Sequence, residues 1–250
     1  MKLKSIRIRH FKAVEDSGPI KFGALTAFVG YNGTGKSSVI EACEFFRDYA
    51  LGGVESALNP WYQYDSILWQ GAERRKSVAG PFYQRPLVIE LAGKGEKTPW
   101  KAHLELGKLA APLRAYEAGA VVVKRELLQV GRDRKIYRIE DRDRGRPRFG
   151  SQLFDQERAV NFRDWMFLSL NPHEIGQPRR RPESKGDEPL LKTGGNLADI
   201  LKTFLDRDRD GFNAMIDALQ YIVPYAANVR PAITKDLVER RSLIQLTERF

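Results

Sequence analysis

The stretch Gly30-Tyr31-Asn32-Gly33-Thr34-Gly35-Lys36-Ser37 decides the fold of this chain, because it matches the pattern G-x-x-x-x-G-K-[ST]. An apolar run, ALTAFV at 24–29, precedes it and predicts a short buried strand. In residues 35–50, which follow, apolar side chains recur at steps of three and four, which predicts an amphipathic helix. The pattern requires this strand–loop–helix context. We therefore predict a phosphate-binding loop.

The residue types explain how such a loop works. Glycines let the backbone bend into a hollow whose N–H groups face a polyphosphate, and the helix N-terminus adds about half a positive charge there. Lys36 is expected to reach the β- and γ-phosphates, Ser37 to ligate the Mg²⁺ that bridges them, and Ser38 to bond an α-phosphate oxygen. The predicted cofactors are ATP and Mg²⁺, and the predicted nucleotide-binding residues of the loop are Gly30, Asn32, Gly33, Thr34, Gly35, Lys36, Ser37 and Ser38.

Outward from the loop, periodicity predicts an α/β fold with a mixed sheet, an antiparallel β insertion and a C-terminal helical part. The expected parts are an N-terminal lobe at 1–85, the insertion at 86–150 and the helical part at 151–250. The expected strands are 3–11, 24–29, 86–91, 101–106, 120–130 and 134–139. In the helical part, Asn196 is expected to cap a helix, and a strand is expected at 229–233, while 236–250 fits either a strand or a helix.

Composition limits the classes of protein that remain. The chain has 250 residues, Lys+Arg 42 against Asp+Glu 32 and a net charge of +10, which excludes a disordered or coiled-coil protein and favours a polyanionic partner such as nucleic acid. A single cysteine, Cys43, excludes an internal disulfide and is expected to pack in the core. No membrane span or signal peptide is recognisable, so a cytoplasmic location without membrane contact is expected.

The N-terminal residues also resemble a known family. The opening IRIRHFKAVED followed by GYNGTGKSSVIEA, with Asn32-Gly33 and Glu41, is similar to the N-terminal lobe of ABC-type P-loop ATPases of the SMC, RecF and OLD-like group. Residues 52–73, 165–172 and 194–205 resemble segments of bacterial ATPases of this group, many of which serve in phage defence. The resemblance implies an ABC/SMC-like head and places Lys12 beside the nucleotide.

The resemblance also implies groups that are harder to find. The family has a glutamine that senses metal and attacking water, for which Gln70 and Gln84 are candidates. It further needs a signature loop and an apolar strand ending in Asp-Glu. LKTGGN at 191–196 is only superficially similar to the loop, and no such strand follows it. The chain is thus expected to be the first part of a head.

The expected function is ATP binding and hydrolysis that switches conformation or dimerisation to control a DNA-associated or phage-defence effector. Expected partners are a second copy across sandwiched ATP or a complementary lobe, an effector subunit and nucleic acid. A nucleotide sensor or scaffold that cannot hydrolyse ATP is an alternative. A kinase of a small acceptor, with the arginine-rich residues 132–148 as its lid, is another. His10, His103 and His173 are isolated and do not suggest a metal site.

Overall fold

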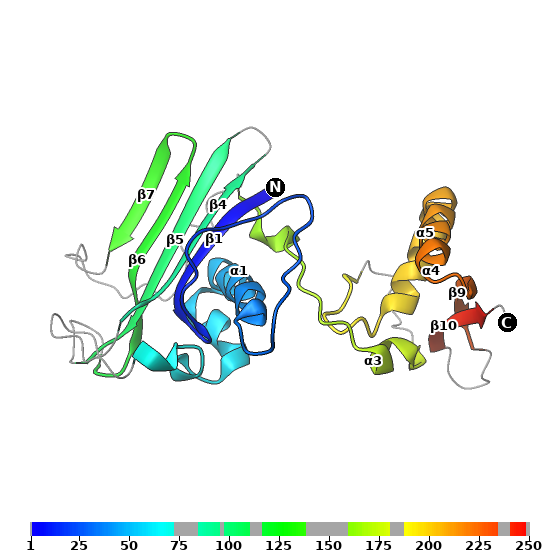
Figure 1. Cartoon of the computed structure of the whole chain (residues 1–250), viewed down its shortest axis with the longest axis horizontal. Helices are drawn as coiled ribbons and strands as arrows, with labels where there is room; N and C mark the ends of the chain where they lie inside the picture. Colours follow the sequence, from blue (N-terminus) through cyan, green and yellow to red (C-terminus); the bar gives the residue numbers. More distant parts are fainter. Residues whose placement is uncertain are drawn as a thin grey trace. The chain divides into compact units, whose positions relative to one another are not determined.

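The computed structural model describes residues 2–72, 85–95, 98–110, 117–138, 160–180, 188–234 and 241–248, and for 134–138 the backbone alone (Figure 1). The chain divides into two compact units, Met1–Trp165 and Met166–Phe250. We call them the first and the second unit.

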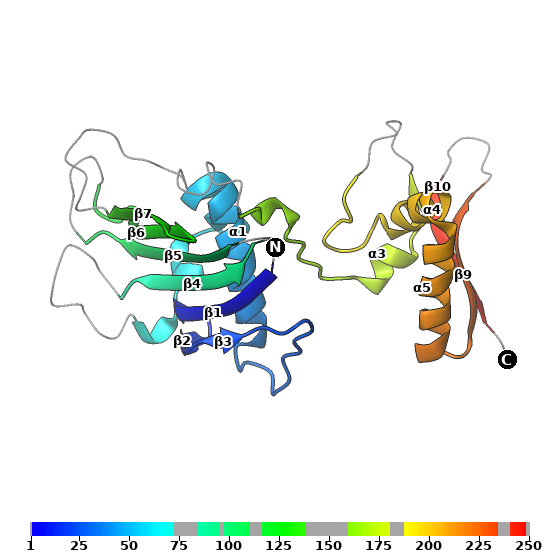
Figure 2. The ribbon, with the colours of Figure 1, turned by 90° about the horizontal axis from the view of Figure 1, so that it is seen from above.

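An antiparallel sheet forms the first unit, and its strands come from both sides of the phosphate loop in the sequence. Its order is β2-β1-β4-β5-β6-β7, and β3 also pairs with β1 (Figure 2). The strands are β1 (Lys2–Phe11), β2 (Val14–Asp16), β3 (Ile20–Lys21), β4 (Leu87–Lys94), β5 (Pro99–Lys108), β6 (Val121–Val130) and β7 (Asp133–Arg138). The strands expected at 86–91, 101–106 and 120–130 are confirmed, the one expected at 134–139 is confirmed over its described residues 134–138, and β4 continues the sheet directly from β1.

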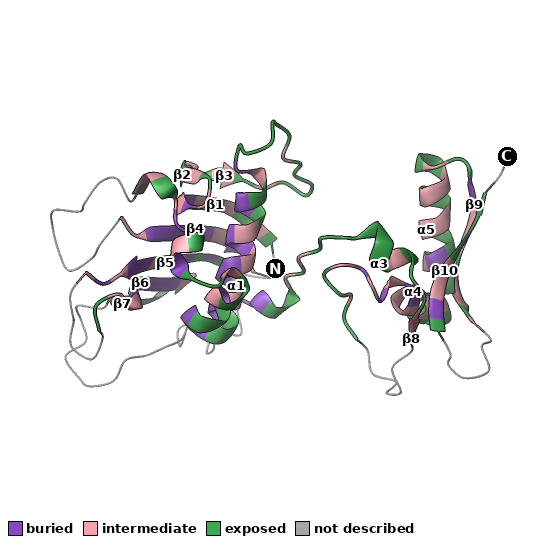
Figure 3. Cartoon of the chain, turned by 90° about the horizontal axis from the view of Figure 1, so that it is seen from below, coloured by how far each residue is buried: buried purple, intermediate pink, exposed green. Residues whose placement is uncertain are grey.

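Helix α1 (Lys36–Leu58) lies against one face of this sheet (Figure 1). Ile6 and Ile8 of β1 are buried, as the alternation in the strand predicts. Figure 3 shows buried residues on both α1 and the strands. The buried residues of the helix include Val39, Ala42, Cys43, Phe45, Phe46, Tyr49 and Ala50. Ile40 was expected on this stripe, but it is 45% exposed, because Ala42 and Phe45 face the core instead.

The strand expected at 24–29 is wrong, since these residues form no strand in the structure. Leu25 is 90% exposed and Val29 93% exposed, and Phe28 makes an edge contact with Phe22. A buried strand needs a neighbouring strand to bond its backbone N–H and C=O groups, and no described strand pairs with this segment. All described pairings are antiparallel, so the mixed sheet is not seen among the described residues.

Helix α1 has a break in its helical backbone at Gly53. The break has φ 79° and ψ −169°. After α1 the chain runs back beside the end of β1. Short 3-10 turns follow, η1 (Asn59–Trp61), η2 (Tyr64–Ser66) and η3 (Gln70–Ala72). The Lys12 amide donates to the Ile67 carbonyl at 2.7 Å. A last turn, η5 (Phe162–Asp164), places Phe162 beside Phe46 and Trp100 in the core.

The described residues of the second unit form three helices and a small sheet of order β8-β10-β9. Its elements are α3 (Pro172–Gly176), β8 (Arg179–Arg180), α4 (Leu197–Arg207), α5 (Arg209–Ile222), β9 (Ala226–Ile233) and β10 (Arg241–Glu248). The strand expected at 229–233 is confirmed, and part of 236–250 is a strand. Asn196 is the N-cap residue of α4, as expected, but its side chain makes no capping hydrogen bond. Its buried side chain bonds the Leu191 amide and the Pro189 carbonyl and so holds residues 189–196 in a fixed loop.

Within the part of the chain that the structure describes, none of the helices has both the length and the apolar composition that crossing a membrane requires.

Candidate nucleotide-binding site

The loop between Gly30 and Ser37 turns directly into the N-terminus of α1. Gly33 and Gly35 have φ of 82° and 88°, a left-handed conformation that strains residues with a side chain. A Cβ on Gly35 would also lie 3.1 Å from a methyl group of Val14, so the glycine lets the loop approach the β1–β2 turn. From the glycines in the sequence we expected the backbone to bend at these positions, and the structure has that bend.

The N-terminus of α1 is open to an anion. Its cap residue is Gly35, no side chain caps it, and its first turn holds no acidic residue. The first N–H groups of a helix have no partner within the helix and carry the positive end of its dipole. Asn32, Gly33 and Ser37 beside it are exposed. A phosphate group can therefore reach these amides.

Lys36 is held by the loop itself. Its Nζ donates to the carbonyl of Gly30 at 2.7 Å and to that of Tyr31 at 2.6 Å. Thr34 Oγ1 donates to the Tyr31 carbonyl as well, at 2.9 Å. These bonds close the loop around the lysine ammonium, which supplies positive charge beside the helix N-terminus.

The two serines after Lys36 differ in their access to solvent. Ser37 is exposed, so its hydroxyl is free to meet a metal ion carried by a nucleotide. Ser38 is 5% exposed, which places its side chain on the core side of the helix. The structure thus favours Ser37 over Ser38 as a group that meets the ligand directly.

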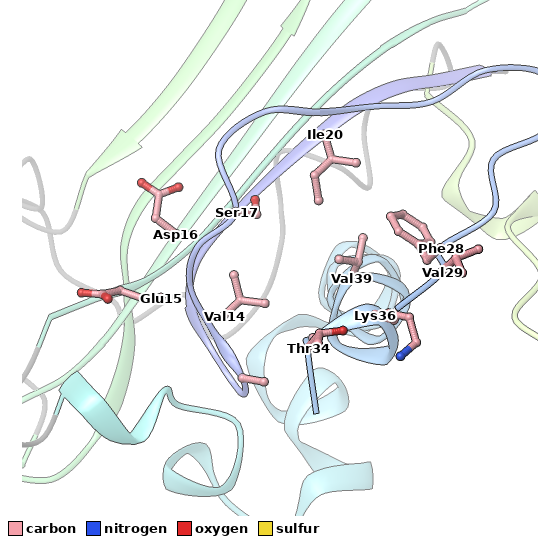
Figure 4. Close-up of a pocket in the computed structure, with 12 residues that line it drawn as sticks. Val14, Glu15, Asp16, Ser17, Ile20, Phe28, Val29, Thr34, Lys36 and Val39 are labelled. Atoms are coloured by element: carbon pink, nitrogen blue, oxygen red, sulfur yellow. The ribbon is translucent and has the colours of Figure 1, made fainter. Parts of the chain in front are cut away.

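A cavity of about 430 Å³ adjoins the loop on the side of the β1–β2 turn (Figure 4). Its walls combine apolar side chains with polar groups at the rim. The lining includes Val14, Ile20, Phe28, Val29, Val39, Thr34 and Lys36. A volume of this size lies in the range of small-ligand sites. The sequence gave no signal for Val14 and Phe28, because only the folded β1–β2 turn brings them next to the loop.

Lys12 lies at that turn but its ammonium is engaged elsewhere. Its Nζ is 2.6 Å from Glu41 Oε2 on α1 and 4.4 Å from the centroid of the Trp61 ring. Its φ is 49°, a conformation that is uncommon for a residue with a side chain. Glu41 was noted only as typical of the family, and Trp61 was missed. Lys12 is close to the loop through its neighbours, since Ala13 and Val14 contact Gly35.

The two glutamine candidates are not brought to the loop by any described contact. Gln70 is exposed in η3, after the segment that pairs with the end of β1. Gln84 lies outside the described residues. Among the described residues no group of three or more His, Cys, Asp or Glu side chains has the arrangement of a metal site.

Cys43 is buried, and burial raises its pKa to about 12, which fits a packing role.

Comparison with known proteins agrees with this geometry. Residues 1–66 match a family model described as an AAA ATPase domain, AAA_15, a family that includes RecF-, SMC- and OLD-like ATPases. The match covers β1, the phosphate loop, α1 and the turns η1 and η2, and it supports ATP binding and hydrolysis by this part of the chain. No curated protein matches the chain.

Proposed function

We propose that this protein is the ATP-binding and ATP-hydrolysing head of an SMC/RecF/OLD-like ATPase, and that nucleotide switches its conformation or its dimerisation. The observation that carries the proposal is the glycine loop that ends at the uncapped N-terminus of α1, with Lys36 beside it. The match of residues 1–66 supports the same class of chemistry.

In this function the residues of the loop bind and orient the triphosphate. The amides of 33–37 donate to its oxygens, and Lys36 exchanges the carbonyls of Gly30 and Tyr31 for phosphate oxygens of greater charge. Mg²⁺, when bound with ATP, neutralises charge on the β- and γ-phosphates, and Ser37 is the residue positioned to ligate it. The nucleoside occupies the cavity next to Val14 and Phe28, whose apolar walls suit a base.

A partner is part of the proposal, because the loop lacks groups that hydrolysis needs. Two carboxylates, Glu15 and Asp16, line the cavity beside it, but Asp16 is engaged by Arg7, as Glu41 is by Lys12. Leu25 and Val29, directly before the loop, are exposed apolar side chains that a partner could cover. A complementary lobe, or a second head across the nucleotide, would supply the groups that hydrolysis needs and cover these side chains. A DNA-associated or phage-defence effector is the output that the family resemblance suggests.

The test compares wild type with Lys36→Ala and with Lys4→Ala, which removes an exposed lysine from β1. Titration with MgATP and release of phosphate are measured for each protein. Lys36→Ala should weaken ATP binding at least about tenfold, since it removes a charge-assisted bond worth ~1.5–3 kcal/mol, while Lys4→Ala should bind as wild type does. Equal affinity in all three would contradict the proposal.

A nucleotide sensor or scaffold without hydrolysis is the second candidate, and the pairing of Asp16 with Arg7 and of Glu41 with Lys12 favours it. ATP binding without phosphate release, also at high protein concentration where heads can pair, would select this alternative. A kinase is less well supported, because residues 133–138 of the arginine-rich stretch form β7 and pair with β6. The remainder of that stretch lies outside the described residues.

A further inference from the structure

A second cavity lies in the first unit, on the face of the sheet opposite α1. Its volume is about 630 Å³. Ile6 and Ile8 of β1 face the core, so the alternating Arg7 and Arg9 project from the other face, where they line this cavity. We call it the outer groove and define it by Arg7, Arg9, Glu90, Lys101, His103, Glu105 and Arg125.

Strand register brings these charges together from four neighbouring strands. Arg9 of β1 is in one row with Val88, Glu105 and Arg125 of β4, β5 and β6. Arg7 is in the next row with Glu90 and His103. Arg7 is paired with Asp16 at 2.7 Å, which leaves Arg9, Lys101 and Arg125 as three cations of the groove against Glu90 and Glu105, an excess of one positive charge.

Two guanidinium nitrogen atoms at this groove, Arg9 Nε and Arg125 Nε, are buried and have no hydrogen-bond partner among the described residues. His103 is not counted with them, because it donates from Nδ1 to Glu90 and a neutral imidazole has one N–H. The nearest carboxylate does not satisfy the Arg9 guanidinium, because its Nη2 lies 3.8 Å from Glu90. A buried donor without an acceptor costs free energy, and donors of this kind are rare in folded proteins. An oxyanion in the groove would accept from them.

The two carboxylates of the groove limit how much negative charge a bound oxyanion can carry. Glu90 accepts from His103 Nδ1 at 3.2 Å, and Glu105 is 3.0 Å from Lys124 Nζ, so both carboxylates are held at the groove. A phosphate monoester or pyrophosphate with two or more negative charges is repelled by them more strongly than a phosphodiester, which carries one. Arginine also suits the paired oxygens of such a group.

We infer that the outer groove binds a phosphodiester group, with Arg9 and Arg125 donating to its oxygens beside His103. The group comes from a free dinucleotide or from a nucleic-acid backbone, which share this chemistry. The second source would give a binding surface to the nucleic-acid partner, and in that respect the inference rests on the proposed function.

The experiment follows the side-chain Nε–H signals of arginine and the ring signals of histidine by NMR in the full chain at low salt. Thymidylyl-thymidine, a single-stranded oligothymidylate long enough to cross the groove, and pyrophosphate are added separately. We expect either diester to shift the signals of Arg9, His103 and Arg125. Tighter binding of the oligothymidylate identifies nucleic acid as the source, and equal binding identifies a free dinucleotide. No shift with either diester, or equal shifts at equal concentrations of pyrophosphate, overturns the inference.

Variants connect the shifts to the groove. Arg125→Gln should weaken diester binding about tenfold, and Arg125→Lys, which keeps the charge but loses Nε, should weaken it less. Lys4→Gln is the control, because it removes a charge from the same sheet outside the groove. Thermal melting checks that each variant folds. If Arg125→Gln does not fold, Arg9→Gln is measured in its place. Unchanged binding in folded Arg125→Gln or Arg9→Gln overturns the inference.

Lys36→Ala separates this inference from the proposed function. That variant should lose ATP binding and keep diester binding, whereas Arg125→Gln should keep ATP binding and turnover. Loss of both ligands in either variant would contradict the assignment of two separate sites.

Discussion

At the scale of single residues, Glu105 shows how neighbours on the sheet set a protonation state. It lies on β5 beside His103 and Lys124. These groups lower its pKa from 4.5 to about 2, although partial burial acts in the opposite direction. The charged form of Glu105 therefore stabilises the folded protein at neutral pH.

This gives a prediction for acid unfolding. Since the folded pKa is lowered, the stabilisation by Glu105 is complete above pH 4.5 and is lost as the pH falls toward 2. Glu105→Gln should lower the free energy of unfolding by about 1–3 kcal/mol at pH 7. Urea unfolding from pH 7 to pH 2 measures the difference from wild type, which should shrink below pH 4.5.

Glu15→Gln is the matched control for that series, because Glu15 is exposed on β2. Its effect should be small throughout. A loss in Glu105→Gln that stays the same at every pH would show that shape or packing, and not the carboxylate charge, is responsible.

Residues with a fixed chemical requirement could be predicted from the sequence. Gly33, Gly35 and Lys36 were found because a phosphate loop needs a bend and a charge at set spacing, and Cys43 because a free cysteine usually packs in a core. Trp61 was missed, since its contact with Lys12 depends on how the chain returns after α1. The roles of Lys12, Gln70 and Gln84 toward nucleotide remain predictions.

At the scale of elements, strands were predictable where polar and apolar residues alternate, as in β1 and β5. The run at 24–29 shows the limit of this reasoning. Its apolar residues indicate a tendency to be buried, but burial needs a neighbouring strand, and a sequence window contains no information about that neighbour. The length of α1 was underestimated for a related reason, because its core contacts continue across Gly53 to Val54 and Ala57.

The Tyr64 side chain connects η2 to the sheet through hydrogen bonds. Its buried hydroxyl donates to the Leu106 carbonyl of β5 at 3.1 Å and accepts from the Leu87 amide of β4 at 3.3 Å. Tyr64→Phe should lower the free energy of unfolding by about 1–3 kcal/mol, because buried polar groups lose a partner. Urea denaturation compares it with Tyr221→Phe, whose ring is 89% exposed and whose effect should be near zero. Equal effects of the two variants would contradict this role.

At the scale of the whole molecule, the phosphate loop belongs to the first unit, and the second unit has its own sheet and helices. Bound nucleotide should therefore slow amide hydrogen exchange in the first unit more than in the second. Hydrogen exchange with saturating MgATP should slow at the amides of residues 30–38 and change little in α4 and α5. At a free ligand concentration of 100 times Kd, the first unit should gain about 2.7 kcal/mol of stability.

Lys36→Ala provides the control for the exchange experiment, since its loop should stay unprotected at the same MgATP concentration. Equal protection across α4, α5 and the loop would contradict an effect confined to the first unit.

The exposed residues 24–29 also affect how the protein behaves in solution. ALTAFV contains no charge, proline or glycine, and its backbone is outside every described ladder of hydrogen bonds. Short uncharged segments with these properties form intermolecular β-structure when chains meet. Self-association should thus grow with protein concentration. Leu25→Lys should keep the protein monodisperse without changing the core, because Leu25 is 90% exposed.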